Sequence, residues 1–366
     1  MENARARHAA RDRAGGRLVA RIVQTGQHYD PAMNEVFFRD LGIPTPEFHL
    51  DVGSGSHASQ TARILERYEA HLIKNRPDAV VVFGDVNSTI ACALAAVKIG
   101  IPVAHVEAGL RSFDRTMPEE INRLLTDAIA GLLLVSEPSG LRNLDREGVD
   151  SAKVRLVGNV MVDTLVTELP KARETDPAKA LSLDHQQFGL ITLHRPSNVD
   201  NPETLRALMT LFEELAQEFP LVFPMHPRTR GAVERAGIKL SGSADARLRI
   251  VDPLPYRENL GLMSAARVVL TDSGGMQEET SVLGVPCLTL RENTERPITL
   301  ELGTSRLVGN DPVRIRAAFA DAVTGRWPKG QAIPLWEGAA APRVADALWS
   351  WCEAGWRDYA SVPGPA

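Results

Sequence analysis

Residues 80–89 read Val-Val-Val-Phe-Gly-Asp-Val-Asn-Ser-Thr, a short apolar run that ends in a glycine, an aspartate and small polar residues. An apolar run without polar alternation is typical of a strand buried on both faces of a parallel sheet. Ser88 and Thr89 are residue types that satisfy free amide groups at the start of a helix. The stretch therefore predicts a strand, a turn and a helix, the repeating unit of an α/β fold.

The same unit recurs along the chain. Short apolar or β-branched runs predict strands at 18–23, 79–83, 103–106, 132–135, 154–157, 190–193, 221–223, 248–251, 267–270 and 287–290. Helix-length segments lie between them, at 60–75, 89–99, 119–129, 202–218 and 276–283. Strand–helix–strand alternation of this kind predicts parallel sheets with right-handed crossovers.

The alternation restarts near the middle of the chain. Residues 164–184 are richer in proline, lysine and glutamate and show no strand pattern, so we interpret them as a hinge between two halves. At about 150 residues per domain, the length of 366 residues fits two domains. We expect Rossmann-like domains at residues 1–166 and 167–341, with a C-terminal helix in 342–366 that packs back on the first domain.

The composition excludes several classes of protein. Hydrophobic residues make up 44% of the chain and charged residues 24%, which is typical of a globular protein. A net charge of −5 argues against a generally basic nucleic-acid-binding protein. No apolar run approaches the roughly 20 residues that cross a bilayer. Cys92, Cys287 and Cys352 match neither a zinc spacing nor a disulfide framework, which favours a reducing cytoplasm.

Acidic residues follow the predicted strands of the first half. Asp85 comes directly after one strand, Glu107 follows the next, and Glu119 opens a helix shortly afterwards. Because ligands bind outside the carboxyl ends of parallel strands, we expect these carboxylates to converge at one edge of the sheet. Clustered carboxylates raise one another's pKa and become usable proton donors and acceptors near neutral pH. Arg111 and Arg123 either balance this charge or hold a substrate.

Simpler structural explanations exist for some of these residues. Acidic groups in the first turn of a helix suit its dipole, and this alone accounts for either Glu119 or Glu120. Residues 87–89 fit a helix cap as well as they fit a ligand site. Asp85 is better placed for chemistry, because it lies directly at the end of a strand.

Basic residues follow two strands of the second half. His194-Arg195 and His226 each stand beside a proline at the ends of consecutive predicted strands. A single histidine in such a place is most often structural, but the repeated His-Arg-Pro association favours an anion site. A metal site is not indicated, because nothing in the sequence fixes a ligand spacing.

A glycine-rich turn follows a later strand. Ser273-Gly274-Gly275 opens a helix, where glycines let a ligand approach and the free amide groups attract phosphate. The turn matches neither a dinucleotide-binding nor a Walker sequence, so it implies neither NAD nor ATP hydrolysis. Glu279, one turn into the helix, suits ribose hydroxyl groups, and Arg296 suits a diphosphate.

Taken in order, these motifs resemble those of the non-hydrolysing UDP-N-acetylglucosamine 2-epimerases. The matching segments are Thr25-Gly-Gln-His28-Tyr-Asp, Gly84-Asp85, His105-Val-Glu107-Ala-Gly-Leu-Arg, Pro118-Glu119-Glu120-Ile-Asn-Arg123, His194-Arg195, His226-Pro-Arg, Asp272-Ser-Gly-Gly-Met-Gln-Glu-Glu279, Thr294-Glu-Arg296-Pro and Leu307-Val-Gly309. They span nearly the whole chain, and their combination is highly specific.

The resemblance implies two Rossmann-like domains in the glycosyltransferase-B arrangement, with the active site in the cleft between them. It implies a cytoplasmic homodimer that acts on a UDP-sugar without a metal or any other cofactor. The implied reaction is reversible epimerisation of UDP-N-acetylglucosamine to UDP-N-acetylmannosamine, through elimination of UDP and its re-addition to a 2-acetamidoglucal.

The resemblance also implies roles for single residues. The catalytic set would be Asp85, Glu107, Glu119 and His194. The residues that bind UDP would be His226, Ser273, Gly274, Glu279 and Arg296. Gln27 and His28 match a region that in some members contacts a second, activating substrate molecule.

Two features depart from the family pattern. The family's first strand, and the loop with an arginine and a lysine that touches the diphosphate, have no counterpart, since Met1 falls about where the next helix begins. Either the true start of the protein lies upstream or the first strand of the N-terminal domain is missing. Asn259 stands where the family commonly has a phenylalanine near the uracil, so stacking on the base would be lost.

Other functions fit parts of the same pattern. They are epimerisation of a UDP-2,3-diacetamido sugar, hydrolytic epimerisation that releases free N-acetylmannosamine, glycosyl transfer to an acceptor, and nucleotide-sugar binding without catalysis. Three carboxylates at strand ends argue against the last two, because a transferase of this architecture needs only one carboxylate base and a binding protein needs none for catalysis.

Overall fold

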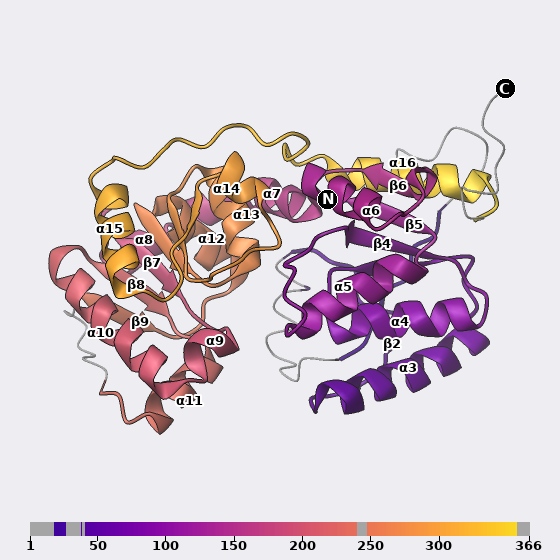
Figure 1. Cartoon of the computed structure of the whole chain (residues 1–366), viewed down its shortest axis with the longest axis horizontal. Coiled ribbons are helices and arrows are strands. Elements are labelled where there is room, and N and C mark those ends of the chain that lie inside the picture. The colour runs from indigo at the N-terminus through magenta and orange to yellow at the C-terminus, as the bar shows by residue number, and fades with distance from the viewer. Residues whose placement is uncertain (1–17, 27–37, 39–40, 240–246, 357–366) are drawn as a thin grey trace. The chain divides into compact units, whose positions relative to one another are not determined.

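The computed structural model describes residues 18–26, 38, 41–239 and 247–356. The chain divides into two compact units. One comprises Met1–Asp163 together with Pro334–Ala366, and the other comprises Thr164–Ile333. Each unit is an α/β structure built on a parallel sheet, as Figure 1 shows. Helix α7 (Val160–Thr175) begins in the first unit and continues into the second.

The first unit holds a four-stranded sheet in the order β3-β4-β5-β6. Its strands are β3 (Val80–Phe83), β4 (Val103–Ala108), β5 (Leu132–Val135) and β6 (Val154–Leu156). A separate parallel pair is formed by β1 (Val23–Gln24) and β2 (Phe48–His49). The helices are α3 (His57–Lys74), α4 (Asn87–Lys98), α5 (Pro118–Ile129), α6 (Pro138–Arg146) and α16 (Ala340–Glu353), with a 3₁₀ turn at Ser151–Lys153.

The central strand β5 is buried on both faces, as its unbroken apolar sequence predicts. Leu133 and Val135 pack into a core with residues of α3 and α4. The alternate residues, Leu132 and Leu134, pack against Trp351 of α16 on the opposite face. The C-terminal helix therefore covers one face of the first sheet, although more than 180 residues separate it from β6 in the sequence.

The second unit holds a six-stranded parallel sheet in the order β12-β11-β10-β7-β8-β9. Its strands are β7 (Gly189–Thr192), β8 (Leu221–Pro224), β9 (Leu248–Val251), β10 (Val268–Thr271), β11 (Cys287–Thr289) and β12 (Ser305–Leu307). Its helices, besides most of α7, are α8 (Pro177–Ala180), α9 (Pro196–Val199), α10 (Pro202–Glu218), α11 (Pro227–Arg235), α12 (Tyr256–Ala265), α13 (Gly274–Leu283), α14 (Ile298–Glu301) and α15 (Pro312–Val323).

The second sheet is also covered on both faces. Ile191 of β7 packs in one core with residues of α10, α11 and α15. Leu190, its neighbour in the strand, packs in another core with residues of α7, α12 and α13. The strand order changes direction between β7 and β10, and at such a point the carboxyl ends of parallel strands form a natural binding site.

Several elements differ from those expected. The strand predicted at 18–23 is observed as β1 at Val23–Gln24, paired with β2, which was not predicted. Strand β12 was also missed, because it is short and carries Arg306 in its centre. Residues 164–184, interpreted as a hinge, contain most of α7 and all of α8.

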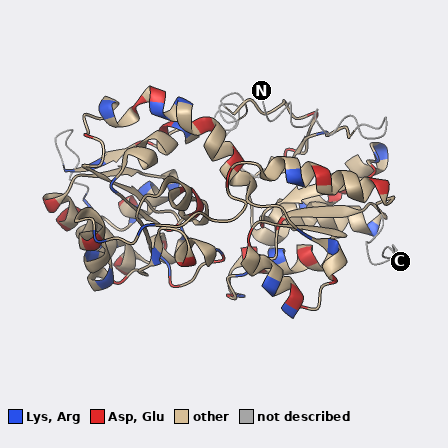
Figure 2. Ribbon diagram, turned by 90° about the horizontal axis from the view of Figure 1, so that it is seen from above, with Lys and Arg blue, Asp and Glu red and all other residues tan. Residues whose placement is uncertain are grey.

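Charged side chains are interspersed over both units, in accord with the small net charge (Figure 2). Among the described residues, no helix is long and apolar enough to span a bilayer.

Candidate functional site

In the first unit, Asp85 is held at the end of β3 by two residues of α5. Gly84, with φ of +64°, makes the sharp turn that brings the chain out of the strand. Arg123 donates to Oδ2 of Asp85 from Nη2 at 2.6 Å and from Nε at 3.0 Å. Asn122 donates to the backbone carbonyl of Asp85 at 2.8 Å. Asp85 is therefore fixed to α5 by both its backbone and its carboxylate, which stays 27% exposed.

Glu107 occupies an irregular position in β4. The pairing of β4 with β5 shifts register between Val106 and Ala108, and Glu107 has a left-handed φ of +72°. Such a conformation costs a non-glycine residue about 1–3 kcal/mol and is concentrated at functional sites. Oε2 of Glu107 lies 4.0 Å from the position that a Cβ on Gly84 would take. The bulge therefore directs the Glu107 carboxylate toward the turn that carries Asp85.

The structure separates the roles of Glu119 and Glu120. The buried Glu120 accepts hydrogen bonds from the backbone amides of Ser112 and Phe113 and from Arg123, at 2.7–3.0 Å. Its carboxylate thus holds the loop after β4 in place. Glu119 is half-buried, and it lies three and four residues before Asn122 and Arg123, on the same face of α5. Of the two glutamates, Glu120 is thus the one with the structural role.

A buried charged network supports this edge of the sheet. His105 donates from Nδ1 to Asp127 at 2.6 Å and from Nε2 to the Gly84 carbonyl at 2.8 Å. Both partners are acceptors only, so the ring carries two protons. Burial alone would lower the pKa of His105, but the hydrogen bond and charge of Asp127 outweigh burial and raise it. A buried imidazolium therefore anchors the turn before Asp85.

Arg111 belongs to the same network. Its guanidinium contacts Asp127 at 2.7 Å and Glu147 at 2.7 Å, and the side chain is 1% exposed. Of the two roles expected for Arg111, balancing charge or holding substrate, this geometry favours the first. Arg123 likewise balances the charges of Asp85 and Glu120.

In the second unit, His194 is oriented by Asp272. Nδ1 of His194 lies 3.0 Å from Oδ1 of Asp272. The carboxylate also accepts from the backbone amides of His194 and Arg195 and from the side chain of Asn198. Burial opposes ionisation of Asp272, but these hydrogen bonds, led by the one from His194, hold its pKa below the ordinary value. The anion fixes the ring of His194, whose side chain is 46% exposed.

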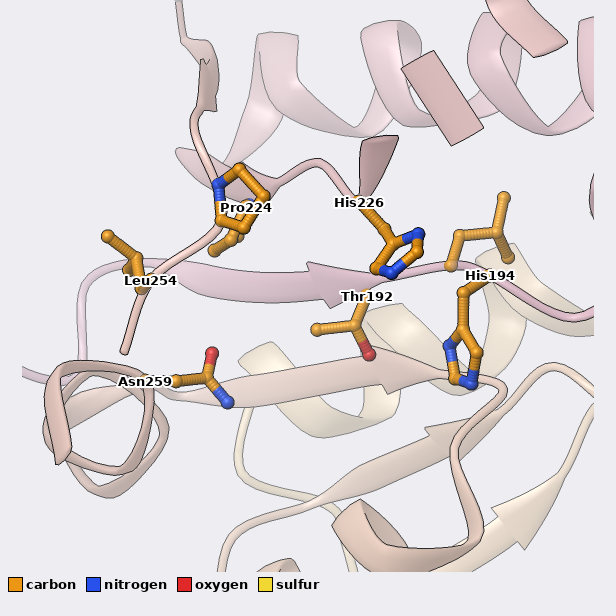
Figure 3. A pocket seen from close by; sticks show the side chains of 8 residues that line it. Thr192, His194, Pro224, His226, Leu254 and Asn259 are labelled. Atoms are coloured by element: carbon orange, nitrogen blue, oxygen red, sulfur yellow. The ribbon is translucent and has the colours of Figure 1, made fainter. Parts of the chain in front are cut away.

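A small pocket lies at the ends of β7 and β8 (Figure 3). Its volume is about 160 Å³, and its lining residues are Thr192, Leu193, His194, Pro224, His226, Pro253, Leu254 and Asn259. The rings of His194 and His226 lie side by side, with centroids 6.4 Å apart. His226 caps the start of α11, because its Nδ1 accepts from the amide of Arg228 in the first turn of that helix. The two histidines predicted at consecutive strand ends thus share one pocket.

The glycine-rich turn forms the start of α13. Ser273 caps the helix by accepting from the amide of Met276 at 3.5 Å. Gly274 is buried, and Gly275 is partly exposed. Arg296 lies beside this helix, where it pairs with Glu278 and Glu295. Burial of Glu279, 6% exposed on the same helix, raises its pKa to about 7.

Two supporting residues were not among the predicted site residues. Asp127 lies 22 positions after His105, and nothing in the sequence links them. Asp272 stands inside a recognised motif, directly after β10. Its position at the end of a strand is the sequence feature that could have indicated a role in the site. Gln27 and His28, predicted at an activating site, lie outside the described residues. Among the residues that the structure describes, no group of three histidines, cysteines or carboxylates is placed to hold a metal.

Comparison with known proteins identifies the family. The family profile described as UDP-N-acetylglucosamine 2-epimerase matches residues 11–349. The chain belongs to this family. The resemblance inferred from the sequence motifs is thereby confirmed, and the chain is a member of a family of UDP-sugar 2-epimerases.

Named relatives differ in the sugar that they act on. A UDP-N-acetylglucosamine 2-epimerase of Methanococcus maripaludis is 42% identical over 299 residues, which is 80% of this chain and 82% of the relative. A UDP-2,3-diacetamido-2,3-dideoxy-D-glucuronate 2-epimerase of Pseudomonas aeruginosa is 43% identical over 291 residues, 79% of each chain.

Solved structures confirm the fold class. The UDP-GlcNAc 2-epimerase of Methanocaldococcus jannaschii, solved in complex with UDP-GlcNAc and UDP, matches with a TM-score of 0.83 and 40% identity. That match covers 90% of this chain and 91% of the other. A trehalose 6-phosphate synthase of Burkholderia multivorans, a glycosyltransferase-B protein, matches in fold alone, with a TM-score of 0.51 and 13% identity. The predicted α/β class with two parallel-sheet domains is therefore confirmed.

Proposed function

We propose that this protein reversibly epimerises carbon 2 of UDP-N-acetylglucosamine to give UDP-N-acetylmannosamine. The observation that carries the proposal is the pair of carboxylates at neighbouring strand ends, Asp85 tied to α5 and Glu107 directed to the same turn by a bulge. A family whose members are named as 2-epimerases of UDP-sugars needs such groups, because the reaction removes and returns a proton.

The chemistry explains why both carboxylates and phosphate-binding groups are required. The hydrogen on carbon 2 is too weakly acidic for direct removal. When the bond from carbon 1 to the diphosphate breaks, UDP leaves with the electron pair and the ring becomes cation-like. A carboxylate then takes the proton from carbon 2, leaving a 2-acetamidoglucal. Return of a proton to the opposite face, followed by re-addition of UDP at carbon 1, inverts the centre.

The first unit supplies the proton-transfer groups in this proposal. Inversion needs one group on each face of the ring, and Glu107 and Glu119 come from different elements, the end of β4 and the start of α5. Either Glu107 or Glu119 removes the proton, depending on the direction of the reaction. Asp85 shares that proton with the base or adjusts the pKa of the base. Positioned groups of this kind typically contribute about 10²- to 10⁴-fold each to the rate.

The second unit supplies the groups for the leaving nucleotide. His194, oriented by Asp272, stabilises the ring cation or the leaving diphosphate. Ser273, Gly274 and Gly275 at the start of α13, with Arg296, bind the diphosphate. Glu279 binds the ribose, and His226 binds the nucleotide from the pocket that it shares with His194. Arg195 adds a cation beside the same helix start.

A second candidate substrate is a UDP-2,3-diacetamido sugar. The Pseudomonas aeruginosa relative of that name is as similar to this chain as the N-acetylglucosamine enzymes are, at 43% identity. The proposed proton transfer at carbon 2 is the same for both sugars. The homodimer implied by the resemblance stays a prediction.

Product analysis tests the proposal. The purified chain is incubated with UDP-N-acetylglucosamine and, separately, with UDP-2,3-diacetamido-2,3-dideoxy-D-glucuronate, and the products are followed by proton NMR. We expect an equilibrium mixture of the gluco and manno nucleotides from the first substrate. If only the diacetamido substrate gives such a mixture, the substrate is that sugar and not UDP-N-acetylglucosamine. Free N-acetylmannosamine would indicate a hydrolysing enzyme, and unchanged substrate in both reactions would leave only nucleotide-sugar binding.

A further inference from the structure

A buried carboxylate, that of Glu295, is surrounded by three arginines near the start of α13. Arg291 donates to its Oε2 at 2.7 Å. Arg296 donates to its Oε1 at 3.0 Å, and Nη2 of Arg195 lies 3.8 Å from the same oxygen. One anion therefore sits among cations that come from two different loops, those after β7 and β11.

The neighbouring helix is shaped to admit this carboxylate. A Cβ on Gly274 would lie 2.6 Å from Oε1 of Glu295, closer than any ordinary contact. A methyl group at position 274 would therefore have to displace the carboxylate of Glu295. Glu295 thus lies against the start of α13 and contacts both Arg296 and Arg195.

The side chains of Glu295, Arg296 and Arg195 differ in the fraction that is exposed to solvent. The Glu295 side chain is 3% exposed, Arg296 is 9% exposed and Arg195 is 21% exposed. Of these three side chains, that of Glu295 is the least exposed and that of Arg195 the most. Arg296 is also paired with Glu278, and Nε of Arg195 donates to the backbone carbonyl of Asp272 at 3.0 Å. Each cation is held by a second contact besides the shared anion.

We propose that Glu295 is a positioning residue that presents Arg195 and Arg296 to the diphosphate of the nucleotide. This inference rests on the proposed function, which places the diphosphate at the start of α13. Without the anion, the arginines would repel one another and turn toward solvent, so that binding would require them to be ordered again. Pre-oriented charge costs no such reorganisation, and it matters most where negative charge develops on a leaving group.

The first test compares UDP with uridine, which lacks the phosphates. E295Q keeps the size of the side chain and removes its charge. Isothermal titration calorimetry should show at least a tenfold loss of UDP affinity and less than a twofold change for uridine. Equal losses for both ligands would indicate a general structural defect and overturn the proposal. Unchanged or tighter UDP binding would overturn it as well.

The second test displaces the Glu295 carboxylate by a substitution at Gly274. In G274A the new methyl group displaces Oε1 of Glu295 without removing a charge, so we expect a selective loss of UDP affinity of similar size. In the double variant G274A/E295Q the losses should not add, because both act through one contact. Additive losses would show that Gly274 and Glu295 act separately and would contradict the proposal. If E295Q folds poorly, titration of G274A with UDP and with uridine remains available, and an unchanged UDP affinity in G274A would then overturn the proposal.

The controls separate this inference from the function on which it rests. A wild-type protein that binds neither UDP nor UDP-N-acetylglucosamine would refute the proposed function. Wild-type binding that E295Q and G274A leave intact would refute only the positioning role of Glu295.

Discussion

The hydroxyl group of Tyr256 donates a 2.9 Å hydrogen bond to Oε1 of Glu279. Burial raises the pKa of Glu279 to about 7, and the hydrogen bond from Tyr256 acts in the opposite direction. The carboxylate that the family resemblance assigns to the ribose therefore changes charge near neutral pH. Whether it accepts hydrogen bonds from the ribose depends on that charge.

The affinity for the nucleoside should consequently depend on pH. Ribose hydroxyl groups donate to the ionised carboxylate, so uridine should bind several-fold more tightly as the pH rises through about 7. Uridine is the suitable ligand, because it lacks phosphates that titrate in the same range. In E279Q this part of the pH dependence should vanish in calorimetric titrations, whereas any pH dependence from other groups should persist. A wild-type profile identical to that of E279Q would show that Glu279 does not bind the ribose in this way.

Removal of the Tyr256 hydroxyl group should shift this profile. Its hydrogen bond lowers the pKa of Glu279, so in Y256F the pKa should rise further. The midpoint of the uridine binding profile should then move to higher pH, while affinity well above the midpoint changes little. A midpoint that moves to lower pH would contradict the assigned direction.

Glu119 and Glu120 form a matched pair for testing the catalytic assignment. E119Q should lower the rate of epimerisation by about 10²- to 10⁴-fold and leave stability nearly unchanged. E120Q should lower the free energy of unfolding by about 1–3 kcal/mol, since Glu120 accepts from the amide groups of Ser112 and Phe113 and is itself buried. Rates and urea unfolding curves of both variants check this. A wild-type rate in E119Q would remove Glu119 from the mechanism.

His105 should make the stability of the chain depend on pH. Its pKa in the folded protein is raised above 6.5, because Asp127 outweighs the effect of burial. The stabilisation from the protonated ring is therefore complete below pH 6.5 and is lost as the pH rises through the folded pKa. Urea unfolding of wild type and H105Q should show the largest stability difference at low pH and a shrinking one at high pH. A difference that grows with pH would contradict the buried imidazolium.

The strand pattern was sufficient to predict the fold class and the strand ends that carry the candidate residues. Asp85 and Glu107 follow apolar runs, so their neighbourhood could be read from the sequence once the sheet was taken as parallel. The bulge at Glu107 could not, because it arises from pairing with β5 rather than from local sequence. The buried partners of Arg111 were also unpredictable, since Asp127 and Glu147 are distant in the sequence.

The same limit applies to the residues that support the second half of the site. Asp272 and Glu295 stand within recognised motifs. Sequence alone did not show that Asp272 orients His194, or that Glu295 contacts several arginines. Such roles depend on contacts between loops that follow different strands. Short edge strands such as β12 were missed for a related reason, because neighbouring strands and not hydrophobic pattern determine them.

The central claim is that the sugar loses and regains the hydrogen on carbon 2 while it is detached from UDP. The most direct measurement is proton NMR of UDP-N-acetylglucosamine incubated with the protein in deuterium oxide. The account predicts deuterium at carbon 2 of both the recovered substrate and the UDP-N-acetylmannosamine formed. A manno product that retains its original hydrogen at carbon 2, or the absence of both deuterium exchange and manno product, would contradict it.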